Sequence, residues 1–327
     1  MDAERNGTDY DYIDTLNQSA PSNVSPDIYN MFLIRTCIRV TFLVVYSATI
    51  SMGLLLNSAV IFMTVKRRHN KKLRQRPFVL GLAVTHLVFC LFTPLYLISA
   101  WNNFSWTFEK AACKLGSYVM FVNMFSGSLM ITFWNVRWCV PACFGRHMST
   151  NMVLLSWSAG AILSTPSLLS RDVQYTVDGD VCMDNYDYSS NIQVSKEGRQ
   201  RMWAVVLCRF LFGLLLPLAV TCFSRCCMNS SGSSKGNSPV VRPVTIAHFL
   251  CWAPVLCLSV LQVTVRNNQT WVTYALSSAT ALSVVNSCLY PVISIFQGQK
   301  ELNVLARPEV PAQIIHDREE GEKESLA

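Results

Sequence analysis

Seven apolar stretches, each about as long as a bilayer is thick, constrain this chain more than any other feature of its sequence. A helix needs about 20 consecutive apolar residues to cross the hydrocarbon core of a membrane. Lipid offers no hydrogen-bonding partner to open backbone, so such stretches must be helical. We therefore expect an all-α membrane protein, a seven-transmembrane helix bundle. The expected spans are residues 40–65, 78–100, 113–140, 152–170, 202–228, 244–265 and 272–296.

The scarcity of charge excludes most soluble classes of protein. Only 14% of the 327 residues are charged and 51% are hydrophobic, whereas an ordinary soluble domain has about 25% charged residues. These figures exclude a disordered chain, a collagen and a small disulfide scaffold, and they disfavour a cytosolic enzyme. The five histidines show no metal-ligand spacing, and neither a nucleophile–base arrangement nor a phosphate loop is visible. We expect no enzyme activity, no cofactor and no bound metal.

One dense basic run, residues 66–76, sets the expected orientation in the bilayer. It carries seven Lys and Arg between two apolar stretches, while the loops 101–112 and 266–271 carry one each. Because positively charged loops stay in the cytoplasm, we expect the N-terminus outside and the C-terminus inside, in a multi-pass protein of the plasma membrane. The net charge of +7 could suggest a nucleic-acid partner. The basic run, however, is better explained as a cytoplasmic loop that lies beside anionic lipid.

N-glycosylation sequons give an independent check on this orientation. Five of them fall on the side expected to be outside, where glycans are added. They begin at Asn6, Asn17, Asn23, Asn103 and Asn268. A sixth sequon, at Asn229, would be cytoplasmic and so unusable. One sequon is weak evidence, but five on one side of an alternating topology agree with the orientation drawn from charge.

Carboxylates gather in two of the segments expected outside. Tyr10 and Tyr12 stand among aspartates in the N-terminal segment, a setting that favours tyrosine sulfation, and Asp184 and Asp187 belong to the acidic loop 171–201. Charge runs are most often merely solvated. Two acidic segments at the outer end of the helix bundle would nevertheless steer a basic peptide or protein ligand inward by long-range attraction. We therefore expect Tyr10, Tyr12, Asp184 and Asp187 at a ligand site.

The cysteines indicate two further features. Cys113 opens the third span and Cys182 lies in the loop 171–201, both on the oxidising side, where disulfides persist. A bridge between them would pin that loop over the mouth of the bundle. Cys222, Cys226 and Cys227 cluster at the inner end of the fifth span, where palmitoylation and plain apolar packing are both open.

Motifs along the spans are specific enough to indicate a family. They are Trp106-Thr107-Phe108 ahead of Cys113, Asn123-Met124-Phe125-Ser126, Arg209-Phe210-Leu211-Phe212-Gly213, Phe249-Leu250-Cys251-Trp252-Ala253-Pro254 and Asn286-Ser287-Cys288-Leu289. Over residues 39–299 the chain resembles a class A (rhodopsin-like) G-protein-coupled receptor of the chemoattractant branch. That branch holds the formyl-peptide, complement-anaphylatoxin and chemerin receptors, and the likeness is greatest to the chemerin receptors.

The resemblance implies roles for residues in the ligand pocket. Arg209 would face the pocket and contact an acidic or C-terminal group of the ligand; the alternative is that its side chain reaches the outer membrane interface. Asn123 and Trp252 would also lie at the ligand site. Trp252 would be a large rotor at the pocket floor, one turn from the kink that Pro254 permits, with buried packing as the plain alternative.

Other residues depart from the family's pattern on the transducer side. The switch and coupling positions are Asn57, His86, Arg137, Trp138, Pro254, Asn286, Tyr290 and Pro291. His86 replaces the sodium-binding carboxylate, and a histidine cannot supply the anionic oxygen that a hard cation prefers. The third-span acidic-Arg motif falls on Arg137-Trp138, with the basic residue one place early, and the seventh span reads Tyr290-Pro291 where the family has Asn-Pro.

These features predict a receptor for an extracellular chemoattractant peptide or protein, chemerin-like and basic. Ligand binding would shift a seven-helix equilibrium and recruit a heterotrimeric G protein, of the inhibitory class, or arrestin. The altered motifs keep a non-signalling scavenger or decoy receptor open, and His86 inside a span is the only support for a small-solute transporter. The expected domains are an acidic glycosylated extracellular segment (1–38), a seven-transmembrane receptor domain (39–299) and a cytoplasmic tail (300–327).

Overall fold

Helices dominate the part of the chain that the computed structural model describes, which is residues 26–66, 76–139, 147–176, 179–187, 195–230, 240–265 and 270–306. The α-helices are α2 (Pro26–Lys66), α3 (Arg76–Trp101), α4 (Lys110–Cys139), α5 (Met148–Ser170), α6 (Lys196–Phe210), α7 (Leu216–Ser230), α8 (Val241–Thr264) and α9 (Thr270–Ala306). A π-helical segment (Leu211–Leu215) joins α6 and α7 into one span. The strands β1 (Arg171–Thr176) and β2 (Gly179–Asp184) follow α5.

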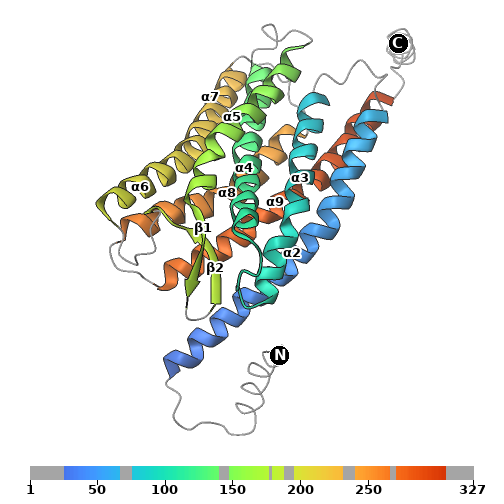
Figure 1. The fold of residues 1–327 in the computed structure, drawn as a ribbon. Helices are drawn as coiled ribbons and strands as arrows, with labels where there is room; N and C mark the ends of the chain where they lie inside the picture. The colour runs from blue at the N-terminus through green and yellow to red at the C-terminus, as the bar shows by residue number, and fades with distance from the viewer. Residues whose placement is uncertain are drawn as a thin grey trace, which may run out of the picture.

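Seven helical stretches among these residues are long and apolar enough to cross a membrane, with α6 and α7 counted together. They coincide with the seven expected spans, so the all-α seven-transmembrane bundle is confirmed. Two helices run past the domain boundaries drawn from sequence: α2 begins at Pro26 and α9 continues to Ala306. A helix of 41 residues is about 60 Å long, and Figure 1 shows α2 projecting well beyond its neighbours.

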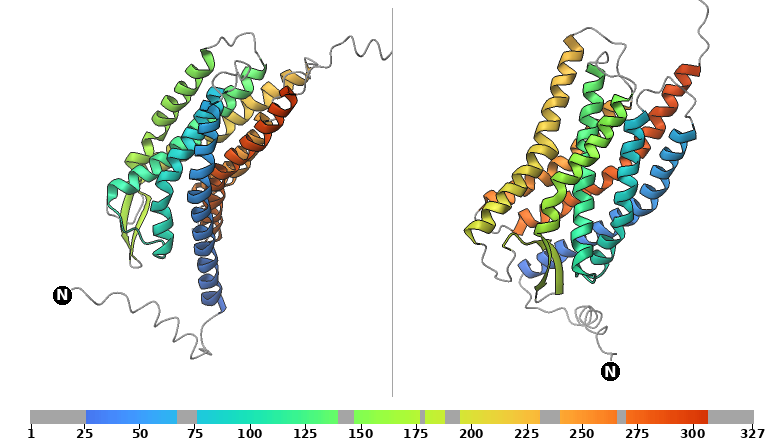
Figure 2. Two further views of the ribbon diagram at one scale, coloured as in Figure 1. Left: turned by 90° about the vertical axis from the view of Figure 1, so that its right-hand side faces the viewer. Right: turned by 45° about the horizontal axis from the view of Figure 1, so that its top comes forward.

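The two strands distinguish the ends of the bundle. They pair antiparallel, with Val173 opposite Cys182, and lie across one end of the helices (Figures 1 and 2). We call this the hairpin end. The opposite end is the one at which α2 ends at Lys66 and α3 begins at Arg76.

The core consists of two apolar clusters with a polar layer between them. The cluster toward the hairpin end includes Phe89, Phe125 and Trp252, and the other includes Leu82 and Trp134. The polar layer lies between them along the helices and comprises the buried residues Asn57, His86, Asn123, Ser128, His248, Asn286 and Ser287. A buried polar group left without a partner costs about 1–3 kcal/mol, so this layer is where hydrogen bonds must join the helices.

Candidate functional site

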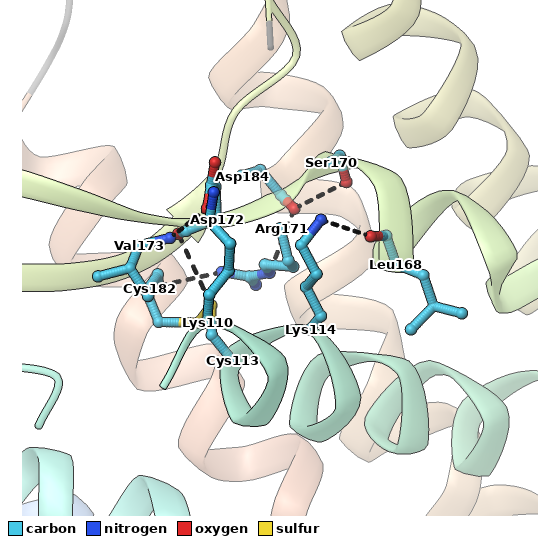
Figure 3. Close-up of a disulfide and its surroundings, with 10 residues drawn as sticks. All are labelled: Lys110, Cys113, Lys114, Leu168, Ser170, Arg171, Asp172, Val173, Cys182 and Asp184. Atoms are coloured by element: carbon cyan, nitrogen blue, oxygen red, sulfur yellow. Dashed lines mark hydrogen bonds and ion pairs between the residues drawn. A yellow bond between two sulfur atoms is a disulfide. The ribbon is translucent and has the colours of Figure 1, made fainter. Parts of the chain in front are cut away.

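The hairpin is fastened to the first turns of α4. The Cys113–Cys182 disulfide joins α4 to β2, and Lys110 Nζ lies 2.8 Å from Asp172 Oδ1 of β1. Figure 3 shows both links side by side, with the strands lying over the start of the helix. The expected disulfide is therefore present, and it holds the loop 171–201 against the end of the bundle.

Buried charges meet where the hairpin reaches the helices. Asp184, the last residue of β2, pairs with Arg171 of β1 (Nε to Oδ1, 3.2 Å) and with Arg209 of α6 (Nη1 to Oδ2, 3.3 Å). Ser170 Oγ and the Tyr186 hydroxyl donate to the two carboxylate oxygens at 3.2 and 3.1 Å. We call Arg171, Asp184 and Arg209 the charge cluster. Two positive charges face one negative charge, so the cluster is positive overall.

The arginines keep Asp184 ionised. Burial by itself would raise the pKa of Asp184, but the guanidinium groups of Arg171 and Arg209 outweigh burial and lower that pKa from 3.8 to about 2. The carboxylate in turn raises the pKa of Arg171 against the effect of burial. Asp184 is thus neutralised within the protein, and it contributes less to the attraction of a basic ligand than the sequence indicated.

We expect the charge cluster to be insensitive to mild acid. Because the folded pKa of Asp184 is lower than 3.8, its ion pairs stabilise the fold above about pH 4, and this contribution, about 2 kcal/mol, is lost as the pH falls toward 2. The stability difference between wild type and Asp184→Asn should be equal at about pH 7 and about pH 5 and should shrink below about pH 4. Thermal-shift measurements on the purified protein check this. A difference that shrinks between the two higher pH values would contradict it.

Arg209 points into the bundle. Arg209 is only 8% exposed, and its guanidinium lies over the Phe121 ring of α4, 3.8 Å from the ring centroid. This placement agrees with the expected inward position and not with a side chain that reaches the membrane interface. Nη2 lies 3.4 Å from Ser167 Oγ, which is long for a hydrogen bond. The guanidinium therefore keeps capacity for a second acidic partner.

Asp187, expected at the ligand site, fixes the start of α6. Its carboxylate accepts the Ser195 amide at 3.0 and 3.2 Å and also the Ser195 hydroxyl. The hydroxyl oxygen accepts the Gly198 amide at 2.9 Å and so caps the helix. Asp187 is thus partnered within its own loop. Tyr10 and Tyr12 lie outside the described residues, and their role stays a prediction.

His86 of α3 joins three helices in the polar layer. Its Nδ1 lies 3.2 Å from Ser287 Oγ of α9 and 3.4 Å from Asn123 Nδ2 of α4. Asn57 Nδ2 of α2 donates to the Ser287 carbonyl at 3.0 Å. Asn123, expected at the ligand site, is 2% exposed and belongs to this network. The layer therefore links α2, α3, α4 and α9.

These residues do not suit a sodium ion. The Oδ1 atoms of Asn57 and Asn123 are buried without a hydrogen-bond partner among the described residues, and amide oxygens are suitable ligands for a hard cation. His86, however, brings nitrogen to the place where such an ion needs an anionic oxygen. With a histidine at position 86, the polar layer lacks the anionic oxygen that a sodium ion requires.

Restoring a carboxylate should restore sodium binding. We expect His86→Asp to place an anionic oxygen beside two free amide oxygens and the Ser287 hydroxyl. Sodium at several times its Kd would then stabilise the variant by about 1 kcal/mol, while wild type should not respond. Thermal-shift titration with sodium chloride measures this, with choline chloride at equal ionic strength as the control. Equal responses of the two proteins to sodium would refute it.

His248 of α8 forms the second half of the polar layer. Its Nε2 lies 2.8 Å from Ser128 Oγ of α4, and its Nδ1 lies 3.3 Å from Asn286 Nδ2 of α9. Ser128 Oγ donates to the Gly213 carbonyl of the π-helical segment at 2.8 Å. A neutral imidazole with its proton on Nε2 satisfies every one of these bonds. One histidine therefore joins α4, α8, α9 and the span that contains α6 and α7.

The family of the chain follows from a match over most of its length. Residues 56–293 match the family described as 7 transmembrane receptor (rhodopsin family). The chain belongs to this family. It is thus a class A G-protein-coupled receptor, a multi-pass protein of the plasma membrane and not an enzyme.

Similar proteins indicate the branch to which the receptor belongs. Chemerin-like receptor 1 of Homo sapiens is 28% identical over 285 residues, which cover 80% of this chain and 76% of that protein. Chemerin-like receptor 2 of Rattus norvegicus is 27% identical over 278 residues (79% and 76%). The C3a anaphylatoxin chemotactic receptor of Danio rerio is 29% identical over 280 residues (80% and 73%). The receptor belongs to the chemoattractant branch.

Trp252 and Pro254 lie in α8 of the receptor, on the hairpin side of the polar layer. Trp252 is 2% exposed and packs in the apolar cluster that contains Phe125 and Leu256. Pro254 removes a hydrogen bond from the helix ladder close by. This placement fits both a rotor and plain packing, and the rotor role of Trp252 stays a prediction.

The opposite end of the receptor is held by hydrogen bonds that the sequence motifs did not indicate. Arg225 Nε of α7 donates to Asn135 Oδ1 of α4 at 3.0 Å, and Asn135 Nδ2 donates to Thr245 Oγ1 of α8 at 3.1 Å. Asn135 is 1% exposed. We call these three residues the clasp. Its only sequence signal is the charge of Arg225 near the end of an apolar stretch.

The predicted coupling residues make other contacts at this end. Arg137 Nη1 donates to Ser149 Oγ at 2.6 Å and joins α4 to α5. The Tyr290 hydroxyl donates to a backbone carbonyl of α3 at 2.7 Å, and Pro291 follows it inside α9. The Trp138 side chain lies outside the described residues.

One of the five sequons can be placed. Asn103 is exposed in the turn between α3 and α4, at the hairpin end. Asn6, Asn17, Asn23 and Asn268 lie outside the described residues. Glycosylation stays a prediction at all five positions.

Proposed function

We propose that the receptor binds an extracellular chemoattractant peptide or protein at the hairpin end, with an acidic or C-terminal group of the ligand on Arg209. Binding would be passed to a heterotrimeric G protein of the inhibitory class, or to arrestin, at the opposite end. Relatives named as chemerin-like receptors support a ligand of the chemerin kind. Orientation, ligand and coupling are all parts of this proposal.

The observation that carries the proposal is the positive excess of the charge cluster. A ligand carboxylate that reaches Arg209 would bring the three charges of the cluster to balance, and charge-assisted bonds to a guanidinium are the strong ones. The cluster lies beside the disulfide-linked hairpin, where a ligand would enter. The acidic N-terminal segment supports a ligand that is basic along its body and anionic at its end.

Three features support placing the hairpin end outside the cell. The Cys113–Cys182 disulfide lies at that end, and disulfides persist in oxidising compartments. The exposed Asn103 sequon lies there too. The basic run 66–76 follows α2 at the opposite end, as the positive-inside rule requires.

Peptides that copy the chemerin C-terminus test the proposal. We expect a peptide with a free terminal carboxylate to bind cells that display the receptor, and the same peptide with an amidated terminus to bind far more weakly. Binding, cAMP and arrestin recruitment are measured on the same cells. If no chemerin peptide binds, the ligand assignment fails, and if amidation has no effect, the role of Arg209 fails.

A scavenger or decoy receptor is the second candidate. It is favoured by the altered coupling residues, since Arg137 is engaged in joining α4 to α5. Ligand uptake without nucleotide exchange on any G protein would support it. Robust G-protein activation by any ligand would exclude it.

A further inference from the structure

Three cysteines, Cys222, Cys226 and Cys227, lie close together in α7 near the opposite end of the receptor. The sequence leaves two uses for them open, apolar packing within the bundle and attachment of an acyl chain. Where their side chains point decides between the two. A packed thiol faces other helices, whereas an acylated thiol must face lipid.

Contacts on one side of α7 fix the rotation of the helix. Thr221 and Ser224 are 4% and 3% exposed, and Arg225 reaches Asn135 of α4 through the clasp. This side therefore faces the bundle. Residues four apart lie on one face of a helix, so Cys222 and Cys226 share another side.

The side that bears Cys222 and Cys226 is exposed. Both cysteines are exposed, Cys227 is half-buried, and Phe223 between them is 70% exposed. In a membrane-spanning helix, an exposed apolar side meets lipid. Cys90 and Cys251 show the contrast, since they are 0% and 2% exposed and pack in the bundle. Packing thus does not account for Cys222 and Cys226.

The depth of these thiols suits an attached acyl chain. α7 ends at Ser230, and the polar run Asn229-Ser230-Ser231 follows the cysteines in the sequence, so the cysteines lie near the end of the apolar stretch, where hydrocarbon gives way to water. An acyl chain attached there can run into the bilayer alongside Phe223. Residues 307–327 contain no cysteine, so they hold no competing thiol. The competing thiols to test are Cys139, the last residue of α4, and Cys143, which follows it in the sequence.

We propose that Cys222 and Cys226 are S-acylated with a long-chain fatty acid, with Cys227 as a third acceptor. The cysteine sulfur forms a thioester with the acyl carbon of a long-chain acyl-CoA. The bond from that carbon to coenzyme A breaks, and coenzyme A leaves as a thiol with the cysteine proton. Burial of the methylenes of the chain in the bilayer stabilises the membrane-bound position, so the acyl chains hold this end of α7 at the bilayer beside the clasp. The inference rests on the proposed orientation, with this end of α7 in the cytoplasm.

Capture of hydroxylamine-sensitive thioesters from cells that express the full-length receptor tests the inference. We expect wild type to be captured and the triple variant Cys222→Ser, Cys226→Ser, Cys227→Ser to fall to background. Cys37→Ser and Cys257→Ser are matched controls, since both cysteines are exposed and lie in the halves of α2 and α8 that are nearer the hairpin end, and they should keep the full signal.

Three outcomes of the capture experiment would overturn the inference. One is no hydroxylamine-sensitive capture of wild type, and another is full capture of the triple variant. The third is loss of the signal in a variant that replaces Cys139 and Cys143, which would place the thioester elsewhere. A C-terminal epitope reports orientation on the same cells. If it stains only after permeabilisation and the thioester is absent, the acylation fails while the proposed orientation stands; staining of intact cells overturns both.

Discussion

Replacing Arg209 by alanine is expected to weaken binding of a ligand with a free terminal carboxylate by about 100-fold, because truncating one partner of a buried charge pair costs about 2–5 kcal/mol. Asp184 would keep Arg171 and the Tyr186 hydroxyl as partners, so we expect the variant to fold. Competition binding with carboxylate and amide forms of one peptide measures the effect. Only the carboxylate form should lose affinity, since only it uses the guanidinium.

Two further variants separate recognition by Arg209 from a structural role. Arg209→Lys keeps the charge but loses the planar fork, so it should recover part of the affinity for the carboxylate peptide. Arg199→Ala removes an exposed arginine of the same helix and should leave both peptides unaffected. Equal losses for the two peptides in Arg209→Ala would show that Arg209 only supports the fold around the hairpin.

The spans could be predicted because the physics that forms them is local. A stretch such as 78–100 is apolar over its whole length, and lipid then dictates a helix whatever its neighbours do. The ends of the helices could not be predicted in this way. Once α2 leaves the bilayer, lipid no longer decides its length, and the helix that begins at Pro26 has no sequence signal comparable to the span itself.

The partners of the site residues could not be predicted in the same way. Arg209 stands out in the sequence as a charge inside a span, but its carboxylate partner Asp184 is 25 residues away in a loop that looks merely acidic. His248 gives no motif at all, because its importance comes from the Ser128 and Asn286 side chains that folding brings to it. Such contacts depend on how each helix is rotated, and tertiary packing sets that rotation.

The clasp should set how easily the opposite end opens. We expect Asn135→Ala to raise ligand-independent opening by about 10-fold or more, because hydrogen bonds that involve a charged group contribute about 1.5–3 kcal/mol and each 1.4 kcal/mol is a factor of about ten in an equilibrium. Thr245→Val removes one bond of the clasp at nearly constant volume and should have a smaller effect in the same direction. Asn151→Ala, which removes an exposed asparagine side chain near the start of α5 at the same end, is the matched control.

An environment-sensitive fluorophore on the start of α8 reports the opening, and cAMP normalised to surface expression reports coupling. If both signals rise in Asn135→Ala, the clasp restrains a receptor that couples to G proteins. If the fluorophore responds and cAMP does not, the bundle opens without a G protein to receive it, as a decoy receptor would. An unchanged fluorophore signal in Asn135→Ala would show that the bonds among Arg225, Asn135 and Thr245 do not restrain α8.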